Sequence, residues 1–79
     1  MMSVETRADR EYIVLTPLIE VGVRPEYVWT LMGELVLTIP MWDEFKRAAS
    51  ALVRDILDYD GVMNIALKSA KGEIWITFI

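Results

Sequence analysis

The sequence predicts a small single-domain α+β protein in the order β-α-α-β-β, in which two helices cover one face of a three-stranded, largely antiparallel sheet. Three observations support this fold class. Aliphatic and β-branched residues run through both terminal regions, as they do in strands. Apolar residues recur at helical spacing through the middle of the chain. A length of 79 residues leaves no room for a second domain.

The N-terminal region divides into a tail and a strand. Residues 1–10 are mostly polar and charged, so we expect a flexible N-terminal segment and place the single domain at residues 11–79. Glu11–Val23 is rich in Ile, Leu and Val, which predicts the first strand. Pro17 cannot donate to a β-ladder, so we expect either one bent edge strand or two short strands that meet at Thr16-Pro17.

A helix is expected to follow this strand. The segment Arg24-Pro25-Glu26 has the proline and the acidic residue that favour a first helical turn. Apolar residues then recur at helical spacing as far as Val36. The opposite side, which includes Trp29 and Leu37, is only weakly polar, so the sequence predicts a helix that is buried on more than one side.

The second half of the chain predicts another helix and a β-hairpin. Met41–Tyr59 has a clear apolar stripe and ends near Gly61, which suits a left-handed C-cap. Val62–Lys68 and Glu73–Ile79 have the composition of strands, and the turn between them ends at Gly72. The last strand is apolar on both faces, so we expect it to be central in the sheet or covered on both sides.

One run of residues resembles part of a known family. Leu18–Trp29 is similar to the opening strand and helix of START/Bet v 1-like lipid-binding proteins. The rest of the chain departs from that pattern, because it has no room for the long curved sheet and the C-terminal helix of that fold. We therefore assign the chain to no family.

The apolar content predicts self-association. Apolar and aromatic residues make up 54% of the chain, and a globule of this size has little interior in which to bury them. Exposed apolar patches usually mark an interface, so we expect a homo-oligomer. It would be a non-enzymatic protein–protein interaction module with an accessory or regulatory role. The expected interface residues are Trp29, Leu37, Trp75 and Ile79, with Trp29 foremost because aromatic residues dominate interface hot spots.

A small-ligand site or an enzyme is the second hypothesis. The chain has no His and no Cys, so acid–base chemistry would fall to carboxylates, Lys or Tyr. Glu20 and Glu34 each lie in an apolar run, and burial of a carboxyl group favours its neutral form, which is one route to an acid–base residue. The alternative is that each side chain points to solvent or pairs with a base such as Arg24.

Metal and cofactor sites have little support in the sequence. His and Cys, the usual ligands of transition metals, are absent. The run Asp58-Tyr59-Asp60-Gly61 is similar to part of a calcium loop, but alignment on Gly61 places Ile56 and Leu67 where acidic ligands belong. We therefore expect no metal and no cofactor.

Nucleic acids and membranes are the remaining candidate partners. A net charge of −4 disfavours binding to phosphates. Basic residues on the second helix and the hairpin keep a winged-helix-like DNA binder as a third hypothesis; they are Lys46, Arg47, Arg54, Lys68 and Lys71. The apolar stretch Tyr27–Trp42 is too short to span a bilayer, and residues 1–10 lack the apolar core of a signal peptide. We expect a cytoplasmic protein, and the absence of Gln and Cys favours a thermophilic source.

Overall fold

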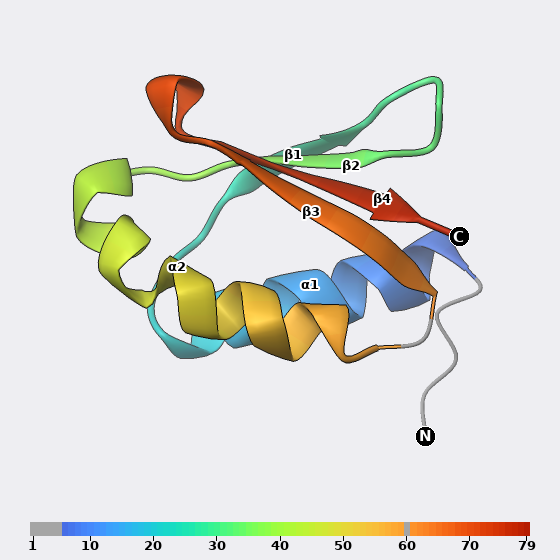
Figure 1. The fold of residues 1–79 in the computed structure, drawn as a ribbon, viewed down its shortest axis with the longest axis horizontal. Coiled ribbons are helices and arrows are strands. Elements are labelled where there is room, and N and C mark those ends of the chain that lie inside the picture. Colours follow the sequence, from blue (N-terminus) through green and yellow to red (C-terminus); the bar gives the residue numbers. More distant parts are fainter. Residues whose placement is uncertain (1–5, 60) are drawn as a thin grey trace.

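The computed structural model describes residues 6–59 and 61–79, apart from the side chains of Arg47, Ala48, Ser50 and Ala51. The described residues form a four-stranded sheet and two α-helices (Figure 1). The elements in chain order are α1 (Arg7–Glu20), β1 (Glu26–Trp29), β2 (Leu35–Thr38), α2 (Trp42–Leu57), β3 (Val62–Lys68), the 3-10 turn η1 (Ser69–Lys71) and β4 (Glu73–Phe78).

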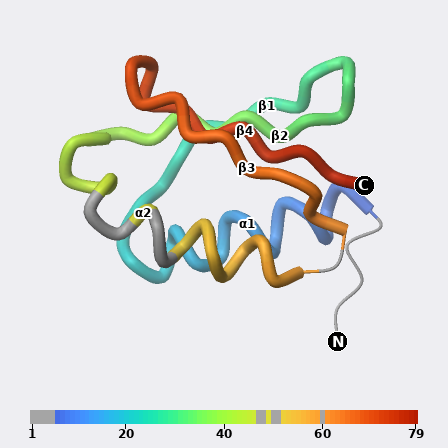
Figure 2. The backbone as a smooth tube through the Cα atoms, viewed as in Figure 1, coloured from blue at the N-terminus to red at the C-terminus, as the bar shows by residue number. Residues whose placement is uncertain are grey.

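The strands form one antiparallel sheet in the order β1-β2-β4-β3. Both helices lie on the same face of this sheet (Figures 1 and 2). The α+β class, the antiparallel pairing, the two-helix cover and the central position of the last strand are confirmed. The order β-α-α-β-β and the three-stranded sheet are wrong, because the first predicted strand is a helix and the first predicted helix is a β-hairpin.

Helix α1 replaces the strand that was expected at residues 11–23. Thr6 caps the helix, because its side-chain oxygen accepts a 3.1 Å hydrogen bond from the backbone N–H of Asp9. Ile13, Val14 and Leu18 are buried against the sheet and α2. Residues 7–10 are already helical, so the domain boundary expected at residue 11 falls inside α1. The rest of the expected flexible segment, residues 1–5, lies outside the described residues.

The end of α1 is fixed by a glycine that follows it. Gly22 has a φ of +83°, and its N–H donates to the carbonyl of Ile19 while the N–H of Val23 donates to the carbonyl of Leu18. These two hydrogen bonds form a Schellman motif, which ends a helix with a left-handed residue. The run that resembled a START/Bet v 1-like opening is therefore a helix end, a turn and β1 rather than a strand followed by a helix.

The β1–β2 hairpin replaces the helix that was expected from Arg24. Tyr27 lies opposite Leu37. The turn between the strands closes with a 3.0 Å hydrogen bond from the N–H of Gly33 to the carbonyl of Thr30. Gly33 has a φ of +81°, which no residue inside a right-handed helix adopts, and a glycine at this position is typical of a short hairpin loop.

Helix α2 and the C-terminal hairpin agree with the sequence prediction. Helix α2 spans Trp42–Leu57 where Met41–Tyr59 was expected, a difference within the usual uncertainty of helix ends. Strands β3 and β4 occupy their predicted positions, and Gly72 between them has the expected positive φ.

The hydrophobic core lies between the sheet and the two helices. Its buried members are Ile13, Val14, Leu18, Leu35, Leu37, Ile39, Phe45, Ala49, Ile56, Val62, Ile74 and Ile76. Successive side chains of a strand point to opposite faces. Because Leu35 and Leu37 of β2 and Ile74 and Ile76 of β4 point into this core, the residues between them point to the other face of the sheet.

Candidate functional site

The sheet face that points away from the helices carries three rows of side chains across the strands. The strand register aligns the members of each row. The first row is mainly charged and contains Glu26, Thr38, Glu73 and Lys68. The second is apolar and contains Val28, Val36, Trp75 and Ala66. The third is polar and contains Glu34, Thr77 and Asn64, with a 3.4 Å hydrogen bond from Thr77 Oγ1 to Glu34 Oε2. Neither α1 nor α2 covers these rows (Figure 1).

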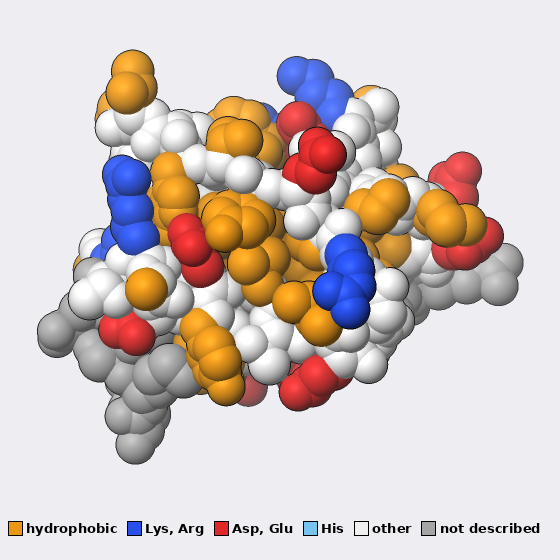
Figure 3. Space-filling view, turned by 180° about the vertical axis from the view of Figure 1, so that it is seen from behind, with side chains coloured by type: hydrophobic (Ala, Val, Ile, Leu, Met, Phe, Trp, Pro, Cys, Tyr) orange, Lys and Arg blue, Asp and Glu red, His pale blue; other side chains and the backbone are white. Residues whose placement is uncertain are grey.

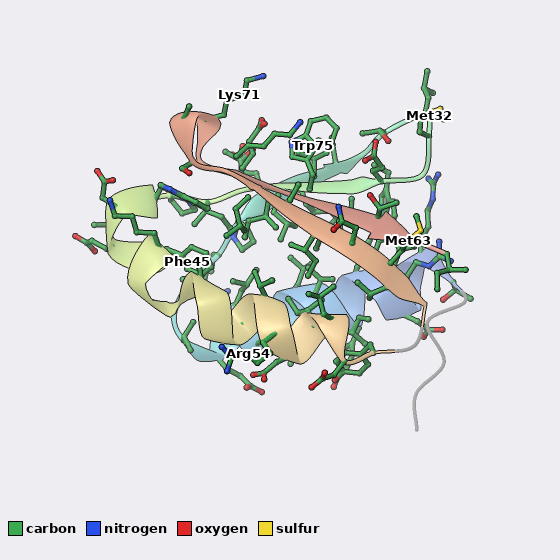
Figure 4. The ribbon with its side chains drawn as sticks, in the orientation of Figure 1. Met32, Phe45, Arg54, Met63, Lys71 and Trp75 are labelled. Atoms are coloured by element: carbon green, nitrogen blue, oxygen red, sulfur yellow. The ribbon has the colours of Figure 1, made fainter. Side chains whose placement is uncertain are left out.

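Trp75 lies in the middle of this open face, above the strands (Figure 4). Its Nε1 donates a 3.1 Å hydrogen bond to Glu73 Oε1. The ammonium nitrogen of Lys68 lies 3.8 Å from the centroid of the indole ring, in a cation–π contact. Trp75 is therefore partly covered by its own neighbours, and Val28 on the edge strand is the most exposed member of the apolar row.

The β1–β2 hairpin also presents apolar side chains at its tip. Leu31 is fully exposed, and Met32 has 86% of its surface exposed. Figure 4 shows Met32 pointing away from the rest of the domain. Val28, Leu31 and Met32 together are called the hairpin surface below. Turn residues are usually Gly, Pro, Asn, Asp or Ser, so two large apolar side chains at a turn need an explanation beyond the turn itself.

A pocket of about 310 Å³ lies where the end of α1 meets the beginning of α2. The connection Val21–Val23 forms one side, and Pro40, Met41, Glu44 and Phe45 form the other. Its walls are mainly apolar, with the carboxylate of Glu44 as the charged group. A volume near 300 Å³ is at the lower end of the range for small-molecule sites. The sequence analysis did not identify this pocket, because its two sides are separated by the whole β1–β2 hairpin.

Trp29, the foremost predicted interface residue, is half-buried at the junction of α1 and the sheet. Its ring centroid lies 5.6 Å from that of Phe78, and the Arg7 guanidinium lies 5.1 Å from it. Its Nε1 donates a 2.8 Å hydrogen bond to Glu11 Oε2. Trp29 therefore joins elements of its own chain rather than standing free on the surface.

Glu11 also accepts a 3.3 Å hydrogen bond from the hydroxyl of Tyr27. The negative charge of Glu11 is the main reason that the pKa of Tyr27 is raised above its ordinary value, with smaller contributions from burial and from this hydrogen bond. The Glu11 carboxylate therefore connects α1 to two aromatic residues of β1.

The other two predicted interface residues differ in exposure. Leu37 is completely buried in the core, so it cannot contact a partner in this structure. Its predicted place on the outer side of a helix was wrong, because Leu37 belongs to β2. Ile79 is 81% exposed at the end of β4, and its carbonyl accepts a hydrogen bond from Arg10 Nη2.

The two candidate acid–base residues are not brought together. Glu20 is exposed at the C-terminal end of α1, whereas Glu34 lies in the turn of the β1–β2 hairpin, just before β2. These parts of the fold lie at opposite ends of the molecule (Figure 1). A shared site between sheet and helices that uses both carboxylates is therefore not formed.

The basic residues proposed for DNA binding are dispersed in the described part of the chain. Lys46 lies 3.4 Å from Asp43, and Lys68 covers Trp75. Lys71 lies in η1, at the tip of the C-terminal hairpin (Figure 4). Among the described residues, no group of three or more acidic side chains could hold a metal ion. No helix in this part of the chain is both long enough and apolar enough to cross a membrane.

Comparisons with models of known protein families, with curated proteins and with solved structures find no match to this chain.

Proposed function

We propose that the protein is a non-enzymatic protein–protein interaction module that self-associates through its hairpin surface. The observation that carries this proposal is the exposure of Val28, Leu31 and Met32, three large apolar side chains on one β-hairpin. Exposed apolar side chains that lie close together are typical of interfaces.

The free energy available from this surface favours association. Full burial of a side chain such as Leu, Met or Val stabilises a complex by about 1.5–3 kcal/mol. In a symmetric dimer each copy buries its own hairpin surface, so six apolar side chains are buried in all. The gain from six side chains, about 9–18 kcal/mol, exceeds the free energy of a micromolar dissociation constant, about 8 kcal/mol, before the costs of association are subtracted.

The non-enzymatic character is supported by the chemistry of the chain. His and Cys are missing from the sequence, and the two carboxylates that were candidates for acid–base work lie at opposite ends of the fold. An accessory or regulatory role, exerted by assembly rather than by catalysis, is the function that this combination favours.

The test is the mass of the protein in solution, measured by size-exclusion chromatography with light scattering. We expect the unmodified chain to be an oligomer at micromolar concentration. The variant Val28→Lys places a charge within the hairpin surface and should shift the equilibrium towards the monomer. Thr38→Lys lies on the same sheet face and on the same hairpin, but in the charged row, and should leave the equilibrium unchanged. A monomer at every concentration would refute the proposal.

A further inference from the structure

We infer that the hairpin tip, Leu31 and Met32, of one copy of this chain occupies the pocket between α1 and α2 of a second copy, and that two such contacts form about a twofold axis. This inference rests on the proposed self-association and names its partner and its contact. It joins two features of the molecule that are otherwise unexplained: an apolar tip and an apolar pocket, neither of which is covered or filled by a side chain of the described residues.

The hairpin tip is held rigid before any partner arrives. The N–H of Thr30 donates a 2.8 Å hydrogen bond to the carbonyl of Glu34. The N–H of Glu34 donates a 3.0 Å hydrogen bond to Thr30 Oγ1. The N–H of Gly33 closes the turn by donating to the carbonyl of Thr30. A preorganised backbone loses little conformational entropy on binding, so the entropic cost of ordering the tip falls mainly on the Leu31 and Met32 side chains.

The pocket matches the tip in size and in polarity. Its volume is about 310 Å³, and the hairpin tip offers two large apolar side chains to occupy it. Val21, Val23, Pro40, Met41 and Phe45 provide apolar walls. Leu31 and Met32 are uncharged, so their entry does not place a second negative charge beside Glu44. Methionine adapts well to irregular apolar gaps.

The positions of tip and pocket allow both contacts to form in one dimer. The tip lies at one end of the long axis of the molecule, and the pocket lies near the other end, where α1 ends and α2 begins (Figure 1). Two copies stacked with their long axes antiparallel place each tip beside the pocket of the other copy. Such an arrangement is closed, because both tips and both pockets are used and nothing remains for a third copy.

The side of the molecule formed by α1 and β1 suits the centre of such a dimer. Figure 3 shows this side, with apolar side chains gathered across its middle. Tyr12 and Ile19 of α1 and Tyr27 of β1 are all exposed apolar residues. Their burial between two copies would add area to the two tip contacts, and a stable interface requires on the order of 1,000 Å² or more.

Disulfide trapping tests the contact directly, since the native chain has no cysteine. Met32→Cys is placed at the tip, and Val21→Cys at the exposed edge of the pocket. A mixture of the two variants under mild oxidation should give a covalent dimer of one chain of each kind, because the two sulfur atoms come within bonding reach. A mixture of Met32→Cys with Leu57→Cys, at the far end of α2, is the matched control and should give far less. Equal trapping in both mixtures would overturn the inference.

The double variant Leu31→Ser/Met32→Ser provides a second, non-covalent test. The tip is exposed, so the variant should fold and unfold like the unmodified chain, as circular dichroism can verify. Its dimer dissociation constant should rise by about a hundredfold or more, because every dimer loses four buried side chains. If the unmodified chain is a dimer but this variant dimerises equally well, the tip contact is wrong; self-association as such stands, and Val28→Lys then decides whether the hairpin takes part in it. If the unmodified chain is a monomer, both are wrong. Assemblies that grow beyond a dimer with concentration would contradict the twofold arrangement.

Discussion

The indole nitrogen of Trp29 donates a 2.8 Å hydrogen bond to Glu11 Oε2. This contact joins the middle of α1 to β1. Because β1 is an edge strand, its neighbour in the sheet is β2 alone, and the contact with α1 holds β1 from a second element. The two residues were assigned by sequence to a strand and a helix, and in the structure the assignment is reversed. The contact is therefore a test of the fold as well as of a local interaction.

Loss of the Glu11 carboxylate should destabilise the domain. In Glu11→Met the Trp29 indole loses its acceptor while the apolar part of the side chain is kept. A hydrogen bond to a charged group at a half-buried site is worth about 1–2 kcal/mol, so the free energy of unfolding should fall by that amount in urea denaturation. Glu20→Met, at the exposed end of the same helix, should change it little. Equal stability of Glu11→Met and the unmodified chain would contradict the contact.

The stability of the protein should fall at alkaline pH through Tyr27. Glu11 raises the pKa of Tyr27 in the folded state, so the folded protein holds this proton to higher pH than the unfolded chain does. The resulting contribution is complete below the unfolded pKa, near 10, and is lost as pH rises through the folded pKa. Thermal unfolding monitored across this window should show the decline, and it should be weaker in Glu11→Gln. An identical decline in both proteins would exclude Glu11 as the cause.

Replacement of Pro17 should stabilise α1. Pro17 lies inside the helix, where its ring nitrogen cannot donate the hydrogen bond that the helix would otherwise form. Pro17→Ala should raise the free energy of unfolding by about 1–3 kcal/mol. Pro25→Ala, which lies outside any helix just before β1, is the control and should bring no comparable gain. If Pro17→Ala destabilises the domain, the helix assignment of this segment fails.

The residue before α2 offers a further stabilising change. Met41 has a φ of 56° and a ψ of 49°, a left-handed conformation that costs about 1–2 kcal/mol for a residue with a Cβ. Met41→Gly should raise the free energy of unfolding by about 0.5–1 kcal/mol, after the entropy of glycine in the unfolded chain is subtracted. Met41→Ala keeps the strain and should give no gain. Guanidinium denaturation of the two variants side by side distinguishes these outcomes.

The second half of the fold could be predicted from the sequence because its signals are local. The apolar stripe of α2 repeats over four turns. The C-terminal hairpin has strands of 7 and 6 residues on either side of a turn that ends at Gly72. Periodicity is most reliable in elements of this length. Trp75 was an interface candidate for which burial in the core was the alternative, and its strand register places it on the sheet face that points away from the helices.

The first half could not be predicted, because its structure depends on tertiary packing and on the backbone conformation of single glycine residues. Ile, Val and Leu favour strands by propensity, yet in α1 they pack as a buried helical face against the sheet. Strands β1 and β2 have four residues each, too few to show alternation. Gly22 and Gly33 were the missed signals, since each has a positive φ: Gly22 ends α1, and Gly33 lies in the turn of the β1–β2 hairpin. Leu31 and Met32 were placed on a buried helix face, and nothing in their residue type indicates a turn.

Sedimentation equilibrium of the unmodified chain over rising micromolar concentrations tests self-association most directly. The account predicts a mass that approaches twice that of the 9.1 kDa chain and then stays constant. A mass of one chain throughout this range would contradict it.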